Sequence, residues 1–338
     1  MKRYTFRSAR REQGLTLIEL MIALVLGLFL VGGVIAVVVA NSQAYRTNEG
    51  LSQVQESSRT AFELLARDLR EAGATGCGNG VVTNVLNGGG GNWLNWTGVR
   101  GYQGGEAAPF ATIGTGVAQR VNGTDAILVQ RISGTGHNVV AHNTGVGGGA
   151  ANFQINSPTT LINDGDILLV CDPTRAVVFQ AQNYNSSNTT IVFNTGGSES
   201  PGNCSKYLNP PASAGACGGG TVNPPFGPNS QIMAPTGTFW YIGNNGRAAE
   251  GGRSLYRTTF GGATEEVVPG VTDMQLSFRD GTANTFGTAP GSWDNVTAVE
   301  VTLTTTSLDA RVSTDPGVND GRLQRSFTSI VGIRNRIQ

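Results

Sequence analysis

The feature that most constrains this chain is an unbroken apolar run near its N-terminus. Between Leu15 and Ala40 the only strongly polar side chains are Thr16 and Glu19. As a helix this run would extend about 39 Å, which exceeds the ~30 Å hydrocarbon core of a bilayer. No proline occurs before Pro109. The run therefore predicts a membrane-spanning helix, with the rest of the chain folded outside the lipid.

A short basic leader precedes the run and predicts its orientation. Residues 1–14 carry five basic residues and one acid, Glu12. Such a leader stays in the cytoplasm, so everything after Ala40 is expected on the other side of the membrane. A secretory signal cleaved after Val38-Val39-Ala40 is the alternative, but its apolar core should measure only about 7–15 residues.

The helical pattern continues past the apolar run with a different character. Charges of alternating sign follow one face from Arg59 to Glu71, and Gly73 is a natural stop. One helix over residues 15–72 is therefore expected, apolar all round in its first half and amphipathic in its second. The apolar stripe of the second half consists of Leu51, Val54, Ala61, Phe62, Leu65, Leu69 and Ala72.

The remaining residues indicate a β-rich body with long loops rich in glycine, above all over residues 78–125. The expected fold class is α+β, with one long N-terminal helix whose amphipathic half packs on a mostly antiparallel sheet. Strands are predicted at 126–131, 166–171, 176–182, 189–193, 238–242, 254–259, 274–278, 296–305 and 328–333.

Four cysteines, Cys77, Cys171, Cys204 and Cys217, follow the apolar run, and none forms a CxxC pair. In an oxidising compartment an even count favours two disulfides over a metal site. If the three strands between residues 166 and 193 form a meander, Cys171 comes near Cys204 and Cys77 is left for Cys217. A local pair between Cys204 and Cys217 is nearly as well supported.

Catalytic motifs are absent from the sequence. HExxH, GxSxG and P-loop patterns do not occur, and His137 and His142 are five residues apart, which is wrong for one helical face. No enzyme activity or cofactor is therefore expected. No metal is expected either, because the acidic pattern at Asp315, Asn319 and Asp320 is better interpreted as a solvated turn than as a calcium site. The chain behind the leader has 18 basic and 22 acidic groups, so no nucleic-acid contact is predicted.

The leader and the start of the run together resemble the class III signal of type IV pilins and type II secretion pseudopilins. The matching residues are Gly14-Leu15-Thr16-Leu17-Ile18-Glu19. The resemblance implies that a prepilin peptidase cuts after Gly14 and that Leu15 is then N-methylated. Phenylalanine is the commonest residue at that position in the family, so Leu15 is a departure that fits minor pilins better than a major subunit.

The same resemblance implies a role for Glu19. An unpaired carboxylate would be costly where apolar helices bundle out of water. Its expected partner is the N-terminal amine of Leu15, in the same or a neighbouring subunit, and Thr16 belongs to the same assembly segment. The pair would set axial register more than it would add stability.

Looser matches along nearly the whole chain resemble PilW-type minor pilins; they lie at 65–77, 165–180, 239–242, 254–257, 268–276 and 325–336. The resemblance implies a cleaved leader (1–14), a pilin helix (15–73), of which 15–40 spans the inner membrane before assembly, and a periplasmic body (74–338) that later reaches the pilus or cell surface. It also implies four partners: prepilin peptidase, other minor pilins, the major pilin and a large pilus-tip adhesin.

Two alternatives remain open. One is a J-type pseudopilin of a type II secretion system. The other is a membrane-tethered adhesin or binding module whose loops use Trp93 and Trp96 to contact a ligand, although these aromatics would serve equally to pin the loop to the body. The main expectation is a minor pilin that primes pilus assembly at or near the tip.

Overall fold

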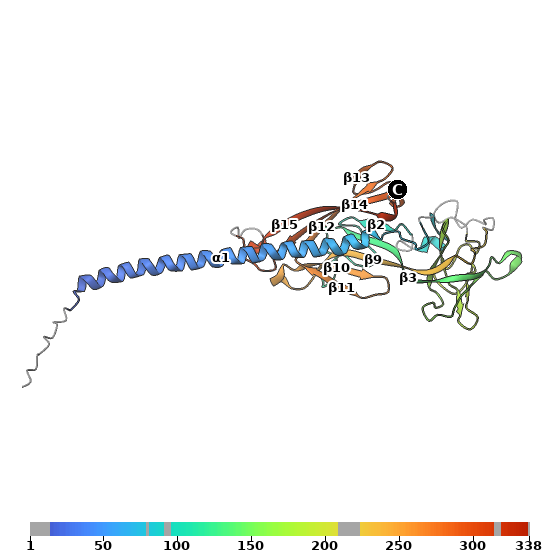
Figure 1. Cartoon of the computed structure of the whole chain (residues 1–338), viewed down its shortest axis with the longest axis horizontal. Helices are drawn as coiled ribbons and strands as arrows, with labels where there is room; N and C mark the ends of the chain where they lie inside the picture. Colours follow the sequence, from blue (N-terminus) through green and yellow to red (C-terminus); the bar gives the residue numbers. More distant parts are fainter. Residues whose placement is uncertain (1–13, 79–80, 91–95, 209–223, 314–318, 337–338) are drawn as a thin grey trace, which may run out of the picture.

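A computed structural model of the chain shows one long helix leading into a β-rich body (Figure 1). It describes residues 14–78, 81–90, 96–208, 224–313 and 319–336. The helix, α1, covers Leu17–Arg70, and the strands of the body form two sheets. The α+β class predicted from the sequence is confirmed, as is the order of one long helix followed by strands.

The body contains fifteen strands within the described residues. They are β1 (Val81–Asn84), β2 (Val99–Tyr102), β3 (Ala126–Asn143), β4 (Asn152–Ile155), β5 (Ile167–Cys171), β6 (Arg175–Gln180), β7 (Asn183–Asn185), β8 (Thr190–Val192), β9 (Gln231–Asn244), β10 (Arg253–Thr259), β11 (Thr264–Pro269), β12 (Val271–Asp280), β13 (Thr285–Gly287), β14 (Val296–Thr306) and β15 (Gln324–Gly332). Short 3-10 turns lie between them: η1 (Asn87–Gly90), η2 (Val146–Gly148), η3 (Ala248–Glu250), η4 (Trp293–Asn295), η5 (Asn319–Gly321) and η6 (Arg334–Arg336). Each of the nine predicted strands overlaps one of these.

The strands divide into a large and a small sheet. The large sheet runs β1-β6-β5-β9-β3-β4-β8-β7, with β10 and β11 added beside β9 and β2 beside β3. The small sheet runs β13-β12-β14-β15. All pairs of these strands are antiparallel except β1 with β6, which run parallel. The mostly antiparallel sheet expected from the sequence is thus present, but as two sheets instead of one.

Local signals at both ends define α1. Thr16 is the N-cap, and with Glu19 it forms a capping box that satisfies two donors of the first turn. At the other end Glu71 is the C-cap, and Gly73 adopts φ +72°, a left-handed conformation that glycine tolerates. The predicted helix 15–72 is correct to within two residues at each end.

The burial of α1 changes along its length, as its two-part pattern predicts. Every described residue up to Ser42 is exposed, so residues 15–42 form a stem that projects from the body (Figure 1). From Gly50 onward one stripe packs on the body, mainly against β11, β14 and β15. Its buried residues are Gly50, Val54, Ser58, Ala61, Leu65, Ala66, Asp68 and Leu69, at helical spacing along one face.

The body has a core beside the helix and a second core remote from it. The near core joins the α1 stripe to inner faces of both sheets, including Trp240 of β9, Met274 of β12 and Val301 of β14. The remote core is built from β3 to β9 and centres on Phe153 and Phe179. Figure 1 shows this part, in green and yellow, at the end of the body farthest from the stem. Because β3 and β9 pair from Ala126↔Tyr241 to Asn138↔Gln231, they connect the two cores.

The disulfide favoured by the meander argument is wrong. Cys77 is bonded to Cys171, with the Cα atoms 5.9 Å apart, which excludes both Cys171–Cys204 and Cys77–Cys217. The reason is topological: β5 pairs with β6, but β8 pairs with β7 and β4, so the three strands do not form a meander. Cys204 is also disulfide-bonded, and the predicted local partner, Cys217, lies outside the described residues.

Candidate assembly surface

The predicted processing site lies in exposed backbone just before α1. Gly14, Leu15 and Thr16 are not helical, and the first helical residue is Leu17. The Leu15 side chain is 78% exposed. The peptide bond between Gly14 and Leu15 is therefore outside the hydrogen-bonded helix, where a peptidase can reach it without unfolding secondary structure.

Glu19 is held toward this end of the helix by Thr16. Its Oε2 atom accepts hydrogen bonds from the Thr16 N–H at 3.0 Å and from the Thr16 hydroxyl at 2.9 Å. The Glu19 N–H donates to the same hydroxyl at 3.3 Å. The carboxylate consequently lies at the first turn, where the helix dipole stabilises negative charge. The structure thus brings Thr16 and Glu19 together, directly beside Leu15.

The stem presents apolar side chains on all sides. Its large hydrophobic residues from Leu15 to Val39 are between about half and four-fifths exposed, the extremes being Val25 at 51% and Leu17 at 80%. Length and composition make α1 the one helix among the described residues that could cross a membrane. A helix apolar all round is stable only in lipid or among other apolar helices.

At the base of the body, the segment around Val312 holds α1 where the stem ends. The Val312 carbonyl accepts from the Gln43 amide at 2.9 Å and from the Thr47 hydroxyl at 3.0 Å. Gly50 allows the close approach, because a Cβ there would lie only 2.8 Å from Val312 Cγ1 and 3.4 Å from Leu323 Cδ1. This contact fixes α1 to the body at the point where the stem ends.

Near its other end, α1 is fixed to the large sheet through a buried carboxylate. Asp68 is 8% exposed; it accepts from Trp240 Nε1 at 2.9 Å and lies 3.4 Å from Arg131 Nη1. Glu71, one turn later, lies 3.4 Å from Arg131 Nε. A buried charge is tolerated only when it is paired and hydrogen-bonded, so this cluster specifies one rotation of the helix on the sheet.

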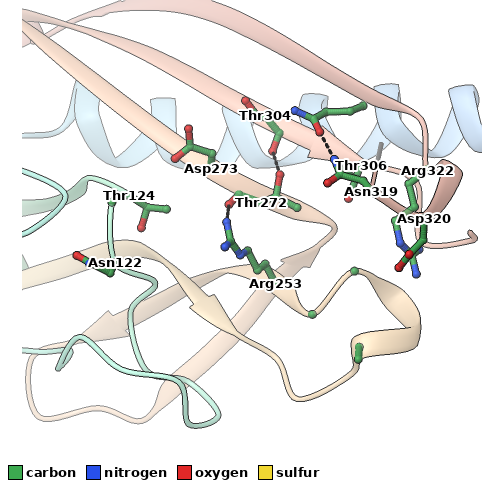
Figure 2. Close-up of a pocket in the computed structure, with 15 residues that line it drawn as sticks. Asn122, Thr124, Arg253, Thr272, Asp273, Thr304, Thr306, Asn319, Asp320 and Arg322 are labelled. Atoms are coloured by element: carbon green, nitrogen blue, oxygen red, sulfur yellow. Dashed lines mark hydrogen bonds between the residues drawn. The ribbon is translucent and has the colours of Figure 1, made fainter. Parts of the chain in front are cut away.

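A polar groove of about 630 Å³ lies beside the small sheet, on the side away from α1 (Figure 2). Its walls come from the loop at 122–124, from the turn between β9 and β10, and from β12, β14 and the start of β15. Both charge signs occur there: Arg253 and Arg322 are basic, and Asp273 and Asp320 are acidic.

The most buried charged group of the groove already has partners. Arg322, 7% exposed, donates to the carbonyls of Ser307, Leu308 and Ala249. Arg253 donates to the Thr272 carbonyl at 3.1 Å, and Asp273 accepts from the Gln275 amide at 2.9 Å. The amide, hydroxyl and charged side chains that line the groove could nevertheless contact a polar ligand. Among the described lining residues no nucleophile is hydrogen-bonded to a base, so the groove assembles no acid–base pair.

The other residues singled out in the sequence lie apart from these surfaces. His142 is packed among Phe153, Phe193 and Phe226, and burial lowers its pKa to about 4. Trp96 is partly buried against the core around Leu86 and Cys171, which supports its use to pin the loop. Trp93 and Asp315 lie outside the described residues. The part of the chain that the structure describes contains no group of three or more metal-ligating side chains.

The start of the chain matches one known family model. Residues 9–35 match the prokaryotic N-terminal methylation motif. The chain carries a type IV pilin-like prepilin signal. Comparisons with curated proteins and with solved structures give no match. The motif supports a pilin-like or pseudopilin protein that a prepilin peptidase processes and that assembles with other pilins, and with the apolar stem it fits membrane anchoring.

The prepilin signal contains every processing and assembly residue predicted from the sequence: Gly14, Leu15, Thr16 and Glu19. Sequence reasoning missed the contacts of Val312 and Asp68 that hold α1 on the body. Val312 acts through its backbone carbonyl, which no side-chain pattern reveals, and Asp68 is hidden among the alternating charges of an amphipathic helix. Its position on the buried stripe was the available signal, because Asp68 lies three residues after Leu65 and one before Leu69.

Proposed function

We propose that this chain is a minor pilin that co-assembles with other pilin-like subunits to prime type IV pilus assembly, at or near the filament tip. The observation that carries the proposal is the head of α1, where the prepilin signal leads into a stem exposed on all sides with Glu19 in its first turn. Such a stem needs lipid before assembly and neighbouring stems afterwards.

The position of Glu19 supports a role in assembly. Cleavage after Gly14 would leave a positive amine on Leu15, one residue from the Thr16 N–H that the Glu19 carboxylate already binds. Among bundled stems the carboxylate would be out of water, and an amine, its own or a neighbour's, would neutralise it. The capping box thus holds the acid ready at the end of the stem where this pairing would occur.

The shape of the body supports a place near the tip. The β3–β9 pair carries the remote core well beyond the last turn of α1 (Figure 1). A subunit inside a filament shaft has neighbours above it, whereas the remote core of an end subunit is unobstructed. In this proposal the body lies in the periplasm before assembly, and its partners are the other minor pilins, the major pilin and a large tip adhesin.

Three variants separate charge pairing from helix capping at Glu19. Glu19→Gln keeps a capping-box side chain but removes the charge, Thr16→Ala removes the cap but keeps the charge, and Glu19→Ala removes both. We expect both Glu19 variants to be depleted about tenfold or more from sheared filaments or minor-pilin complexes, a loss that corresponds to about 1.4 kcal/mol. Thr16→Ala, which keeps the charge, should stay within about threefold of wild type.

The processing step is tested by mass spectrometry of the mature N-terminus. An N-methylated Leu15 is expected in the wild type and in each variant that the peptidase cleaves. A chain that begins at Met1 or Asn41 would contradict the proposal, as would Glu19→Ala subunits that join assemblies as well as wild type.

The polar groove favours a second candidate, a membrane-tethered binding module. Asn122, Arg253 and Asp273 are among the residues that line it, and its volume leaves room for a small polar ligand (Figure 2). A double variant, Arg253→Ala with Asp273→Ala, that abolishes surface attachment but leaves assembly intact would favour this candidate. A J-type pseudopilin would instead be indicated if deletion of the gene stops protein secretion and leaves pili intact.

A further inference from the structure

We infer that the free edge of β15 is a docking strand to which a different subunit of the same assembly adds one β-strand. The class of partner rests on the proposed function. β15 is the last strand of the small sheet, and within the described residues nothing pairs with its outer edge. It is nine residues long and pairs with β14 in a continuous register, from Ala298↔Gly332 to Thr306↔Gln324.

The register identifies which backbone groups are free. Hydrogen bonds run from the Ser307 N–H to the Leu323 carbonyl and from the Ile333 N–H to the Thr297 carbonyl, each 2.8 Å long. In an antiparallel ladder these bonded pairs alternate with pairs that point outward. Odd-numbered residues of β15 therefore bond β14, while Ser326, Thr328 and Ile330 direct N–H and C=O groups to the open edge.

β15 lacks the devices that protect other edges of this protein. The free edges of β1, β2, β7 and β13 are only three or four residues long. β11 is six residues long but carries Glu265, Glu266 and Pro269 and pairs through a register shift. β15 has no proline and no bulge, and its single charged residue is Arg325. A long edge with a regular register and without these devices is a template for another strand.

The side chains along the edge indicate the chemistry of the partner strand. On the outer face, hydroxyl pairs join Thr302 to Thr328 and Thr304 to Ser326, each at 2.9 Å. Ile330, the next residue on that face, is 58% exposed. An added strand with serine or threonine and then a β-branched apolar residue would extend this row and cover Ile330.

The direction of β15 argues against β15 of a second copy of this chain as the occupant. Leu323, just before the strand, lies beside Gly50, and Asn335, just after it, donates to the Ala72 carbonyl at 3.2 Å. β15 therefore runs in the same direction as α1 (Figure 1). Two copies paired antiparallel would point their stems in opposite directions, which one membrane does not allow. Two copies paired parallel through the same edge would need a two-fold axis along the stem, which helically stacked subunits lack.

A matched pair of variants in the full-length chain tests the edge. Ile330→Pro removes one outward N–H at a position where an edge strand accepts proline, and Ile330→Thr shortens the same side chain but keeps the N–H. We expect Ile330→Pro to reduce co-purification with other pilin-like subunits about tenfold, and Ile330→Thr to stay within about threefold of wild type. Formation of the Cys77–Cys171 bond and an unchanged melting temperature would show that each variant is folded.

Hydrogen exchange gives a test that needs no variant. The amides of Ser326, Thr328 and Ile330 should exchange quickly in the purified full-length protein and at least about tenfold more slowly in the assembled complex. The amides of Phe327 and Ser329 should be protected in both. Edge amides that are equally fast in the complex, together with normal co-purification of Ile330→Pro, would overturn the inference.

Two further outcomes are distinguishable. Concentration-dependent protection of the edge in the purified protein alone would assign it to a second copy and would contradict the partner proposed here. A wild-type chain that keeps its leader or joins no assembly would contradict the proposed function itself, before the edge is tested.

Discussion

Asp68 determines how α1 lies on the body, because it is the buried acid of the helix stripe and both of its partners come from the large sheet. Trp240 donates to one carboxylate oxygen and Arg131 lies beside the other. Rotating the helix by one residue would leave the acid facing apolar side chains of the near core. The residue therefore contributes orientation as well as stability, as buried polar pairs can.

Replacing Asp68 with alanine should lower the free energy of unfolding by about 3 kcal/mol, since the Trp240 N–H and the Arg131 guanidinium lose their buried acceptor. Glu71→Ala is the matched control: Glu71 pairs with the same arginine but is about half exposed, so its removal should cost under about 1 kcal/mol. Tryptophan fluorescence during denaturant unfolding of the detergent-solubilised protein measures both. Equal losses would contradict the assigned role of Asp68.

His142 makes the remote core sensitive to acid. Its folded pKa is lowered to about 4 by burial, below the ~6.5 of an unfolded histidine, so the unfolded chain binds the proton more tightly. Its contribution is fully present above about pH 6.5 and is lost as the pH falls from there toward 4. Between pH 7 and 4.5 the loss should be on the order of 2 kcal/mol.

His142→Phe checks this pH dependence. The variant leaves the Phe226 N–H without the acceptor that His142 Nδ1 provides at 2.9 Å, so it should be less stable than wild type at pH 7. The informative quantity is the difference in stability between pH 7 and pH 4.5, which should be smaller in the variant by about 2 kcal/mol. An unchanged difference would show that other groups cause the acid sensitivity.

At the scale of the element, α1 depends on one close approach to the body. Gly50 is the position where helix and body approach too closely for a side chain to fit without displacement of Val312. Gly50→Leu should lower stability by about 1–3 kcal/mol through overpacking. Gly50→Ala should change it little, because about 1 kcal/mol of gained helix propensity offsets a small shift of the Val312 methyl group.

Gly27→Leu is the control for Gly50, because a Cβ at Gly27 would meet nothing within 4 Å. Thermal unfolding of the body should be the same in Gly27→Leu and wild type. If Gly27→Leu destabilises the body as much as Gly50→Leu, the effect comes from the helix itself and not from its contact with Val312.

Elements were predictable from the sequence where one local signal acts alone. The end of α1 follows from Gly73, and the strands predicted at 238–242 and 254–259 pair as β9 and β10 across the turn residues Asn244-Asn245-Gly246. The extension of β3 to Asn143 was missed, because Ser133-Gly134-Thr135-Gly136 reads as a turn. The strand continues through it because its partner β9 is long on both sides, and tertiary pairing overrides the local preference.

For the whole molecule, long-range pairing was the part that the sequence left open. The meander assumed for the strands before Cys204 fails because β7 comes between β6 and β8 and moves β8 next to β4. The same holds for the candidate sites: residues 14–19 form one contiguous motif that can be seen in the sequence, whereas the groove collects residues from 122 to 324 and was not predicted. Spacing within a motif is visible in sequence, but contacts between distant segments are not.

The Cys77–Cys171 disulfide should stabilise the body as a whole, because it closes a loop of 94 residues. Replacing both cysteines with serine is expected to lower the free energy of unfolding by about 2–4 kcal/mol. Limited proteolysis should then cut between residues 78 and 125 faster than in wild type. Peptide mapping without reduction should recover Cys77 joined to Cys171, and a peptide joining Cys171 to Cys204 would contradict the structure.

The continuity of α1 also has a mechanical consequence. A pull on the stem enters the body along the helix axis, and β15 and the side-chain contacts from Gln43 to Asp68 run beside that axis. Tension therefore loads these contacts in shear, all at once, instead of peeling them apart one by one. The body of this subunit should therefore stay folded on its helix under forces that would detach a domain joined only to the end of its membrane helix.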